Sequence, residues 1–312
     1  MKAVSIETIP WEIDHPTGSL AFKYLLSGDE ASPDNFVLLL ARQQKHFATE
    51  RHRHNFDQFR FPISGDMNVG TGIRLPEGQL GYFTEGAPYG PQDDPLEPAS
   101  RDERIHLTLQ FGGATGYGYL GPKRLRAVRD ELRKEGEFVD VHYRRHDGKM
   151  QGGLDAVWQR AFGSRLEYPR PRYPGPIIMD PRSFRWLADA GATEVECKHL
   201  GAFTERGVWA EILRLKPGAM LTPQRPDTRR LFFVLSGSGD IEGTQVSRHS
   251  AIQLDPGETG RIRAKETLEL LLFGLPTISS AVAAAPSQAI KEPASDRFTE
   301  NTKSTMGKAP GR

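Results

Sequence analysis

The chain has 312 residues, a formal net charge of +1 and 26% charged residues. This near-neutral balance excludes the strongly basic surfaces by which proteins bind nucleic acids and anionic membranes. Cys197 is the only cysteine, so a disulfide framework is excluded and a reducing compartment is favoured. No apolar run approaches the ~18 residues of a membrane span, and the opening residues lack a secretion signal. The composition predicts a cytoplasmic protein with no nucleic-acid or membrane partner.

Short apolar runs rich in β-forming residues recur along the chain, separated by turn sequences such as PEG, SGD, KPG and DPG. Such runs, bounded by glycine and proline, are typical of antiparallel strands. The predicted strands are FVLLLA (36–41), FRFPI (59–63), IHLTLQF (105–111), WAEILRL (209–215), LFFVLSG (231–237) and LELLLFGL (268–275). This pattern predicts an all-β-dominated sandwich or barrel architecture.

A different pattern lies between the two groups of strands. The segment GPKRLRAVRDELRKEG (121–136) has a proline near its start and a glycine at its end, and it places Leu125, Val128 and Leu132 on one stripe. These features predict an amphipathic helix.

Other segments outside the strands predict shorter elements. Helices are expected over residues 154–163 and 180–191. The sequence YPRPRYPGP (168–176) predicts a connector that is neither helix nor central strand, because proline lacks a donor and restricts its neighbours. The small, polar and proline-dotted segment 279–312 predicts a disordered tail.

Two parts of the chain repeat each other. RHRHNFDQFRFPISGD aligns with PQRPDTRRLFFVLSGSGD when Gly65 is matched with Gly237, an offset of 237 − 65 = 172 residues. Downstream, Gly86 of GYFTEGAPY matches Gly257 of AIQLDPGETG at 257 − 86 = 171, so the register slips by one residue. Two β modules of similar plan, joined by the helical region, follow from this repeat.

The repeated motifs resemble those of the cupin superfamily, in the form of a bicupin. Cupins carry His-x-His, then Glu three or four residues later, then glycine after a short strand, and a second motif Pro-x-Gly-x-x-His. RHRHNFDQFRFPISG and EGAPY of the N-terminal module match the ligand spacing, whereas LKPGAMLTP, FFVLSGSGDI and LDPGETG of the C-terminal module match the backbone plan. The resemblance implies two cupin-type jelly-roll (double-stranded β-helix) barrels.

The resemblance also suggests domain boundaries and partners. The expected segments are an N-terminal cupin with an N-terminal arm (1–120), a helical and proline-rich connector (121–195), a degenerate C-terminal cupin (196–278) and the tail (279–312). A small-molecule substrate is implied, and pairing through sheet edges would give a homodimer.

The histidine pair of the N-terminal module is the strongest candidate for a metal site. His52, His54, Gln58 and Arg60 share one parity, so on a continuous strand their side chains project from one face. Two imidazoles on one face form a minimal clamp for a divalent first-row metal. The alternative is a solvated edge strand that happens to carry two histidines.

The resemblance implies the other metal ligands. Gln58 stands where cupins usually have glutamate, and Tyr89 stands where they usually have the last histidine. Tyrosine ligates only as phenolate, so His106, on the strand 105–111, is the alternative final ligand. The expected cofactor is Fe²⁺, with Mn²⁺, Ni²⁺ and Zn²⁺ as alternatives.

Three residues have candidate roles in catalysis. Arg60 could hold a substrate carboxylate by a bidentate contact, or it could form an ion pair across the sheet. Glu85 could act as a general base if burial raised its pKa, although exposure in a turn is the favoured interpretation. Tyr89 would act next to the metal.

The C-terminal module lacks ligands at the matching positions, which are Gln224, Pro226, Arg230 and Gly260. The resemblance therefore implies a cupin shell without a metal there. The function expected for the chain is a metal-dependent oxygenase-type oxidoreductase acting on a small anionic or enolisable organic substrate. The alternatives are a metal-dependent isomerase or lyase, and a non-catalytic bicupin that binds a ligand.

Overall fold

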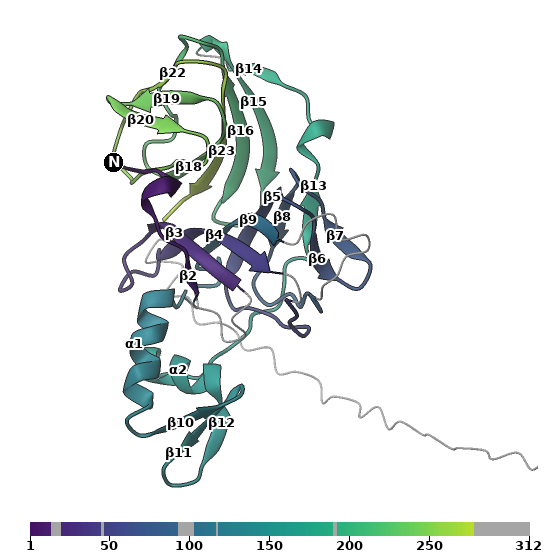
Figure 1. Cartoon of the computed structure of the whole chain (residues 1–312), viewed down its shortest axis with the longest axis vertical. Coiled ribbons are helices and arrows are strands. Elements are labelled where there is room, and N and C mark those ends of the chain that lie inside the picture. The colour runs from purple at the N-terminus through teal and green to yellow at the C-terminus, as the bar shows by residue number, and fades with distance from the viewer. Residues whose placement is uncertain (14–19, 45–46, 93–102, 117, 190–191, 278–312) are drawn as a thin grey trace, which may run out of the picture.

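The computed structural model describes residues 1–13, 20–44, 47–92, 103–116, 118–189 and 192–277, and the tail predicted from residue 279 lies outside these ranges. Two seven-stranded antiparallel sheets dominate the described part of the chain, and a small module with two helices lies beyond the N-terminal sheet (Figure 1). The predicted all-β architecture of two modules is confirmed.

The N-terminal sheet has the strand order β13-β8-β5-β9-β4-β3-β2. Its strands are β2 (Glu12–Ile13), β3 (Leu20–Ser27), β4 (Phe36–Gln44), β5 (Asp57–Ser64), β8 (Leu80–Phe83), β9 (Glu103–Phe111) and β13 (Ile177–Met179). A separate hairpin consists of β6 (Met67–Gly70) and β7 (Ile73–Leu75).

The C-terminal sheet has the order β1-β21-β18-β23-β16-β15-β14, and a four-stranded sheet accompanies it. The large sheet contains β1 (Lys2–Val4), β14 (Leu187–Asp189), β15 (Ala192–Ala202), β16 (Trp209–Leu215), β18 (Arg229–Ser236), β21 (Ala251–Leu254) and β23 (Leu268–Leu275). The smaller sheet contains β17 (Met220–Leu221), β19 (Ser238–Ile241), β20 (Thr244–Ser247) and β22 (Ile262–Ala264).

The predicted repeat is present in the strands themselves. The starts of β5 and β18 differ by 229 − 57 = 172 residues, and the starts of β8 and β21 differ by 251 − 80 = 171. The matched glycines Gly65 and Gly237 have φ values of +78° and +81°. Side chains other than glycine are strained in this region, so the same turn requires glycine in both modules.

Each large sheet takes an edge strand from outside its own module. β1, at the start of the chain, pairs with β21, and Lys2 lies opposite Gln253. β13, which follows the proline-rich connector, pairs with β8, and Ile177 lies opposite Tyr82. The two barrels therefore exchange their edge strands.

The alternation of side chains gives the two faces of each sheet different roles. On β5 and β9, Phe59 and Leu109 are buried in a core that both large sheets share. Phe273 of the C-terminal sheet stacks on Phe59 at a ring-centroid distance of 5.0 Å. Arg60 and Thr108, on the opposite face, line the interior of the N-terminal barrel. The shared core joins the barrels and leaves their inner faces available for a site.

The module beyond the N-terminal barrel has a small core of its own, which includes Val128, Leu132, Tyr143 and Trp158. Two helices, α1 (Pro122–Leu132) and α2 (Gly153–Phe162), flank a three-stranded sheet of β10 (Gly136–Val139), β11 (His142–Arg145) and β12 (Met150–Gly152). The helices predicted over 121–136 and 154–163 are confirmed, and the small sheet between them was not predicted. We call residues 121–163 the insert.

The helix predicted over residues 180–191 is wrong. A 3₁₀ turn (Pro181–Ser183) is followed by β14 (Leu187–Asp189), which pairs with β15 at the edge of the C-terminal sheet. Phe184 and Trp186 are half-buried while their neighbours Arg185 and Leu187 are exposed. This period of two belongs to extended chain rather than to a helix.

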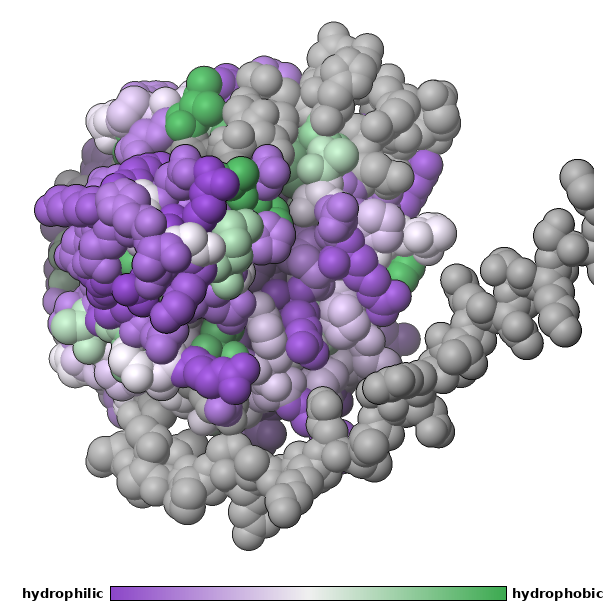
Figure 2. Space-filling view, turned by 90° about the horizontal axis from the view of Figure 1, so that it is seen from below, coloured by the Kyte–Doolittle hydropathy of each residue, from purple (hydrophilic) through white to green (hydrophobic). Residues whose placement is uncertain are grey.

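The end of the molecule that carries the insert presents a mainly hydrophilic surface with scattered apolar residues (Figure 2). A short 3₁₀ turn (Ile6–Thr8) completes the described elements. Among the described residues, neither α-helix is long and apolar enough to span a membrane.

Candidate functional site

A cavity of about 800 Å³ opens between the inner face of the N-terminal barrel and the insert. Strands β3, β4, β5 and β9 supply one wall, and α1 and α2 supply the other. The apolar and aromatic lining includes Phe22, Tyr24, Leu39, Phe56, Tyr119 and Trp158. The polar lining at the barrel end includes His52, His54, Arg60, Gln92, His106 and Thr108. The volume is typical of a site for a small organic molecule.

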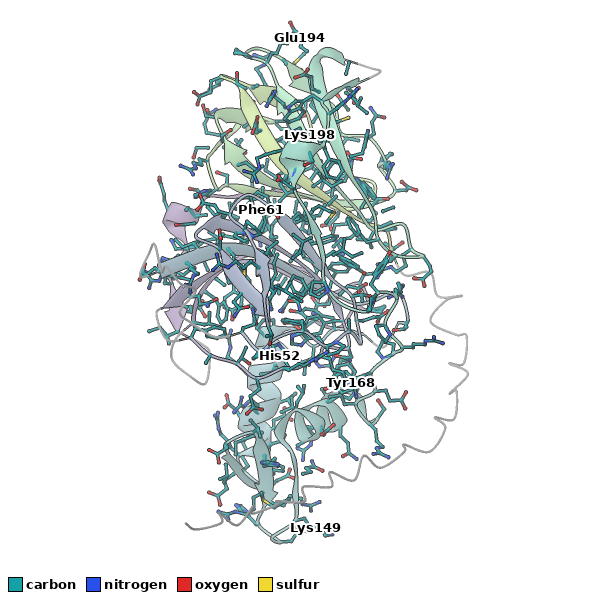
Figure 3. All side chains as sticks on the ribbon, turned by 90° about the vertical axis from the view of Figure 1, so that its right-hand side faces the viewer. His52, Phe61, Lys149, Tyr168, Glu194 and Lys198 are labelled. Carbon is teal, nitrogen blue, oxygen red and sulfur yellow. The ribbon has the colours of Figure 1, made fainter. Side chains whose placement is uncertain are left out.

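The two predicted histidines lie together at the entrance of the barrel. β5 begins at Asp57, so both residues precede the strand rather than belong to it. An isolated β-bridge nevertheless holds the backbone of His52 beside that of Tyr89. The amide N–H groups of His52 and Tyr89 each donate to the other residue's carbonyl. The imidazole rings of His52 and His54 lie 5.1 Å apart. Figure 3 places His52 at the end of the barrel that faces the insert, near Tyr168.

Tyr89 joins the other ligand positions that the cupin resemblance implies. Its hydroxyl lies 3.0 Å from His54 Nε2 and accepts a hydrogen bond of 3.1 Å from Gln58 Nε2. The ring of His52 lies 4.5 Å from the ring of Tyr89. The structure therefore brings together His52, His54, Gln58 and Tyr89, which we call the ligand positions.

Arg60 contacts the same group of side chains. Its Nη2 donates to the Tyr89 hydroxyl at 2.7 Å, and its Nε donates to Gln58 Oε1 at 3.2 Å. Nη1 donates to Gln92 Oε1 at 3.4 Å. None of these three partners is a carboxylate. The predicted alternative role of Arg60, an ion pair across the sheet, would require an acid on the neighbouring strands, but its neighbours there are Gly81 and Thr108.

His106 lies deeper in the barrel and contacts none of the ligand positions by a hydrogen bond. It is 5% exposed, and its Nδ1 has no hydrogen-bond partner among the described residues. Thr108 is 4% exposed and its Oγ1 is likewise without a partner there. Because Arg60 pairs with Thr108 and Pro62 with His106 across β5 and β9, both unpaired groups lie beside Arg60.

The charge states at the site follow from burial. Burial, and then the neighbouring Arg60 charge, lowers the pKa of His106 to about 3. Burial, and then the Arg60 charge, lowers the pKa of His52. Burial, then the neighbouring His52 and then Arg60, lowers the pKa of His54. Burial raises the pKa of Tyr89 above its ordinary value. At neutral pH the imidazoles are therefore uncharged and the phenol keeps its proton.

These donors do not fit the metal that cupins imply. Neutral imidazoles suit a first-row ion, but a protonated phenol does not ligate, and Gln58 Oε1 already accepts from Arg60. Two like unit charges about 4 Å apart near a protein surface repel by about 4 kcal/mol, and a divalent ion would double this repulsion. Among the described residues, no group of three or more His, Cys, Asp or Glu side chains could hold a metal ion.

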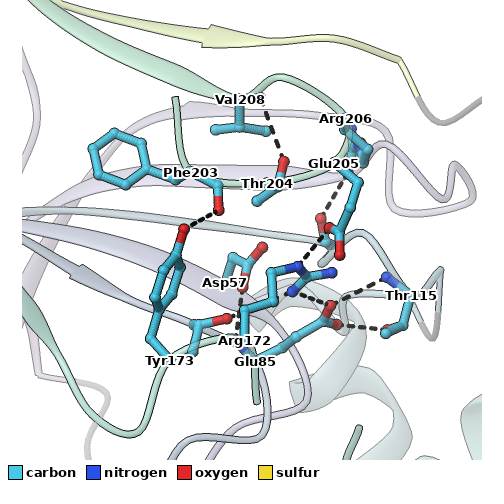
Figure 4. Close-up of polar contacts among 12 residues, drawn as sticks. Asp57, Glu85, Thr115, Arg172, Tyr173, Phe203, Thr204, Glu205, Arg206 and Val208 are labelled. Atoms are coloured by element: carbon cyan, nitrogen blue, oxygen red, sulfur yellow. Dashed lines mark hydrogen bonds and ion pairs between the residues drawn. The ribbon is translucent and has the colours of Figure 1, made fainter. Parts of the chain in front are cut away.

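Glu85 lies away from the cavity, in a buried network between the barrels (Figure 4). Its carboxylate is 0% exposed and accepts hydrogen bonds from Arg172 Nη1 at 2.7 Å and from Thr115 N and Oγ1 at 3.1 and 2.6 Å. The favoured prediction that Glu85 is exposed in a turn is therefore wrong. The turn is covered by the proline-rich connector, since a Cβ on Gly86 would lie 1.9 Å from the carbonyl oxygen of Pro169.

Asp57 belongs to the same network. Its Oδ1 accepts a 2.7 Å hydrogen bond from the backbone N–H of Glu85. Burial, and then the charge of Glu85, raises the pKa of Asp57 to about 7. Arg172 reaches this pair from the connector and also pairs with Glu205 of the C-terminal module at 2.5 Å. The network thus connects the N-terminal barrel, the connector and the C-terminal module.

The interior of the C-terminal barrel is filled by apolar side chains. Phe232, Val234, Leu270 and Leu272 belong to one buried cluster there. Arg230, at the position matched with Gln58, is 1% exposed, and its terminal nitrogens donate to the carbonyl groups of Pro223, Gln224 and Glu258.

Sequence reasoning missed several parts of the cavity. Gln92 and Tyr168 lie in segments rich in turns and prolines, where no periodic pattern predicts the direction of a side chain. The contribution of the insert was missed because it depends on how α1 and α2 pack against the barrel. Thr108 had a usable signal, since it shares parity with His106 on a predicted strand.

No family model and no curated protein sequence matches the chain. Solved structures match its fold. Streptomyces albus HEPD with 2-hydroxyethylphosphonate and Fe(II) matches with a TM-score of 0.53 at 14% identity, covering 93% of this chain and 80% of that one. Quercetin 2,3-dioxygenase from Acinetobacter baumannii matches with a TM-score of 0.51 at 14% identity, covering 89% and 87%.

A mutant of Bacillus subtilis oxalate decarboxylase also matches, with a TM-score of 0.50 at 15% identity, covering 88% of this chain and 77% of that one. At these identities the likeness concerns the fold alone. The paired sheets, the internal repeat and these matches together show that the chain has the bicupin type of cupin fold.

Proposed function

We propose that this chain binds a small organic anion in the cavity of its N-terminal barrel. The observation that carries the proposal is the position of Arg60, a guanidinium that faces the cavity and donates only to neutral oxygen atoms among the contacts described above. A partly buried cation without an anionic partner is costly. A carboxylate entering the cavity would supply that partner through charge-assisted hydrogen bonds.

The rest of the cavity supports a ligand with further polar and apolar parts. Thr108 Oγ1 and His106 Nδ1, both unpaired among the described residues, lie beside Arg60. They fit an oxygen atom next to the carboxylate, as in a 2-oxo or 2-hydroxy acid. Phe22, Tyr24 and Tyr119 line the cavity further out and fit an apolar or aromatic body.

The imidazoles favour binding over acid–base chemistry. An efficient general base has a pKa near the working pH, whereas the pKa of His106 is lowered to about 3. Tyr89 keeps its proton because burial raises its pKa. We therefore place a non-catalytic, ligand-binding role first.

The test is a calorimetric titration of the purified chain with mandelate, phenylpyruvate and phenylacetate, with the uncharged mandelamide for comparison. We expect mandelate and phenylpyruvate to bind more tightly than phenylacetate, and mandelamide to bind least. Arg60→Gln should weaken mandelate binding about 10- to 100-fold, because one charge-assisted contact contributes about 1.5–3 kcal/mol. Arg185→Gln, at an exposed arginine just before β14, is the matched control. Equal binding by both variants would refute the proposal.

A second candidate is the metal-dependent oxygenase that the sequence predicts. Two observations favour it: the neutral imidazoles of His52 and His54 lie 5.1 Å apart, and solved structures of this fold include one with bound Fe(II). An isomerase or lyase would use the same pair of ligands.

Metal analysis separates the two candidates. The chain would be incubated with Fe(II) under argon, passed through a desalting column and analysed for iron, and oxygen uptake with phenylpyruvate would then be recorded. About one equivalent of iron together with oxygen uptake would establish the oxygenase. Less than about a tenth of an equivalent would leave the anion-binding role.

A further inference from the structure

We infer that the guanidinium group of Arg60 takes the place of the metal ion in the N-terminal barrel. The inference rests on the proposed function in one respect, since the anion would then bind to an arginine where metal cupins offer an ion. It concerns the design of the site, and it can be tested without any organic ligand.

The contacts of Arg60 carry the inference. Of the ligand positions, two accept hydrogen bonds from this guanidinium through their oxygen atoms: Tyr89 at 2.7 Å and Gln58 at 3.2 Å. A third, His54, joins the group through the Tyr89 hydroxyl at 3.0 Å. The side chains that would surround an ion are thus organised around a positive charge that belongs to the chain.

The two departures from the cupin motif suit a guanidinium. Gln58 provides a neutral amide oxygen that accepts from Nε, and Tyr89 provides a hydroxyl oxygen that accepts from Nη2. Both groups are uncharged and still accept hydrogen bonds from an arginine. Neither is a strong metal ligand in its uncharged form. Because Arg60 lies two residues after Gln58 on β5, its side chain leaves the same face of the strand.

The C-terminal barrel contains an independent parallel. Arg230 occupies the position matched with Gln58, since 230 − 58 = 172, which is also the offset between β18 and β5. Its guanidinium donates to the backbone carbonyls of Pro223, Gln224 and Glu258 and is 1% exposed. Both barrels therefore hold an arginine at or beside the ligand positions. Arg60 faces the cavity, whereas Arg230 is buried against backbone carbonyls.

The test removes the guanidinium and restores the ligands of the cupin motif. The triple variant Gln58→Glu/Tyr89→His/Arg60→Ala has the carboxylate and the imidazole of the cupin motif and lacks the guanidinium. Binding of Co(II) would be measured by equilibrium dialysis and by the visible spectrum of the bound ion. We expect less than about a tenth of an equivalent in the unmodified chain and about one equivalent in the triple variant.

Two further variants isolate the role of Arg60. Gln58→Glu/Tyr89→His, which keeps Arg60, should bind Co(II) at least 100-fold more weakly than the triple variant. The variant Gln224→Glu/Gly260→His in the C-terminal barrel is a background control and should bind none, because that barrel has Gln224 and Pro226 at the places of the two imidazoles and keeps Arg230. Circular dichroism and thermal unfolding would verify that each variant folds.

Three results would overturn the inference: stoichiometric Co(II) in the unmodified chain, equal affinity of the double and triple variants, or loss of mandelate binding when the unmodified chain is treated with a chelator. The first and third use the unmodified chain, so they decide the matter even if a variant does not fold. If no anion binds but the Co(II) results are as expected, the proposed function fails and the role of Arg60 stands.

Discussion

The two barrels share one plan and differ in what fills them. The strand pairing matches Arg60 with Phe232, Thr108 with Leu272 and His106 with Leu270, because Arg60 lies opposite Thr108 and Phe232 lies opposite Leu272. The three inward-facing residues that give the N-terminal barrel its polar interior are thus apolar in the C-terminal barrel. Whether a barrel of this plan holds a ligand site or a packed core therefore depends on whether a few inward-facing side chains are polar or apolar.

This difference also divides the energetic roles. Full burial of a large apolar side chain contributes roughly 1.5–3 kcal/mol, and the C-terminal interior gains this contribution at each of its matched positions. The N-terminal interior instead buries polar groups, which oppose folding unless they are paired. We expect the C-terminal barrel to carry stability and the N-terminal barrel to carry binding.

The largest effect is expected from Phe232→Ala, which should lower the free energy of unfolding by about 3–5 kcal/mol, because it leaves a cavity in a fully buried cluster. The matched change Arg60→Ala should cost much less stability and should weaken mandelate binding about 10- to 100-fold, as for Arg60→Gln. Chemical denaturation of the two variants gives the comparison. A larger loss for Arg60→Ala than for Phe232→Ala would contradict this division of roles.

A second effect is expected from pH, and it should arise in the N-terminal half. Asp57 keeps its proton in the folded chain up to about pH 7, whereas in the unfolded chain it loses the proton near pH 4, at about the ordinary value. The free energy of unfolding should therefore fall as the pH rises from about 4 to about 7. The matched position of the C-terminal module, 57 + 172 = 229, holds Arg229 and has no such acid.

Asp57→Asn isolates this contribution, because the amide oxygen still accepts from the N–H of Glu85. Stability of the variant should vary less between pH 4 and pH 7 than that of the unmodified chain, as thermal unfolding at several pH values would show. Parallel pH profiles for the two proteins would mean that Asp57 does not hold a proton in the folded state.

The smallest effect is expected from exchanging one matched pair. His106→Leu removes a buried imidazole whose Nδ1 is unpaired among the described residues, so it should raise the free energy of unfolding by about 1 kcal/mol. It should also weaken mandelate binding. The reverse change Leu270→His should lower stability. A stability loss in both variants would show that His106 has a packing role that its contacts do not reveal.

Most of the fold could be predicted from the sequence. Periodicity identified six strands and two helices. Gly65 and Gly237 gave the offset of the repeat, and Gly86 and Gly257 gave its slip of one residue. The helix over 180–191 failed because pairing with β15 decides the structure there and a single strand's sequence does not reveal its partner. The strands of the insert are short and mostly exposed, so they lack an alternation that could identify them.

The site was predicted in part. The motif spacing correctly brought His52, His54, Gln58 and Tyr89 together. It did not show that Arg60 contacts the same side chains, nor that Glu85 is buried against Arg172, because both depend on contacts between distant segments. The roles of these residues in binding a metal or a substrate stay predictions.

The exchange of edge strands has a consequence for how the molecule is made. Lys2 pairs with Gln253, so β1 has no partner in this sheet until β21, about 250 residues later in the sequence, has been synthesised. In the same way, the N-terminal sheet lacks its edge strand β13 until Ile177 to Met179 have been synthesised. A chain divided between residues 163 and 177 would therefore leave each part without an edge strand that the other part carries.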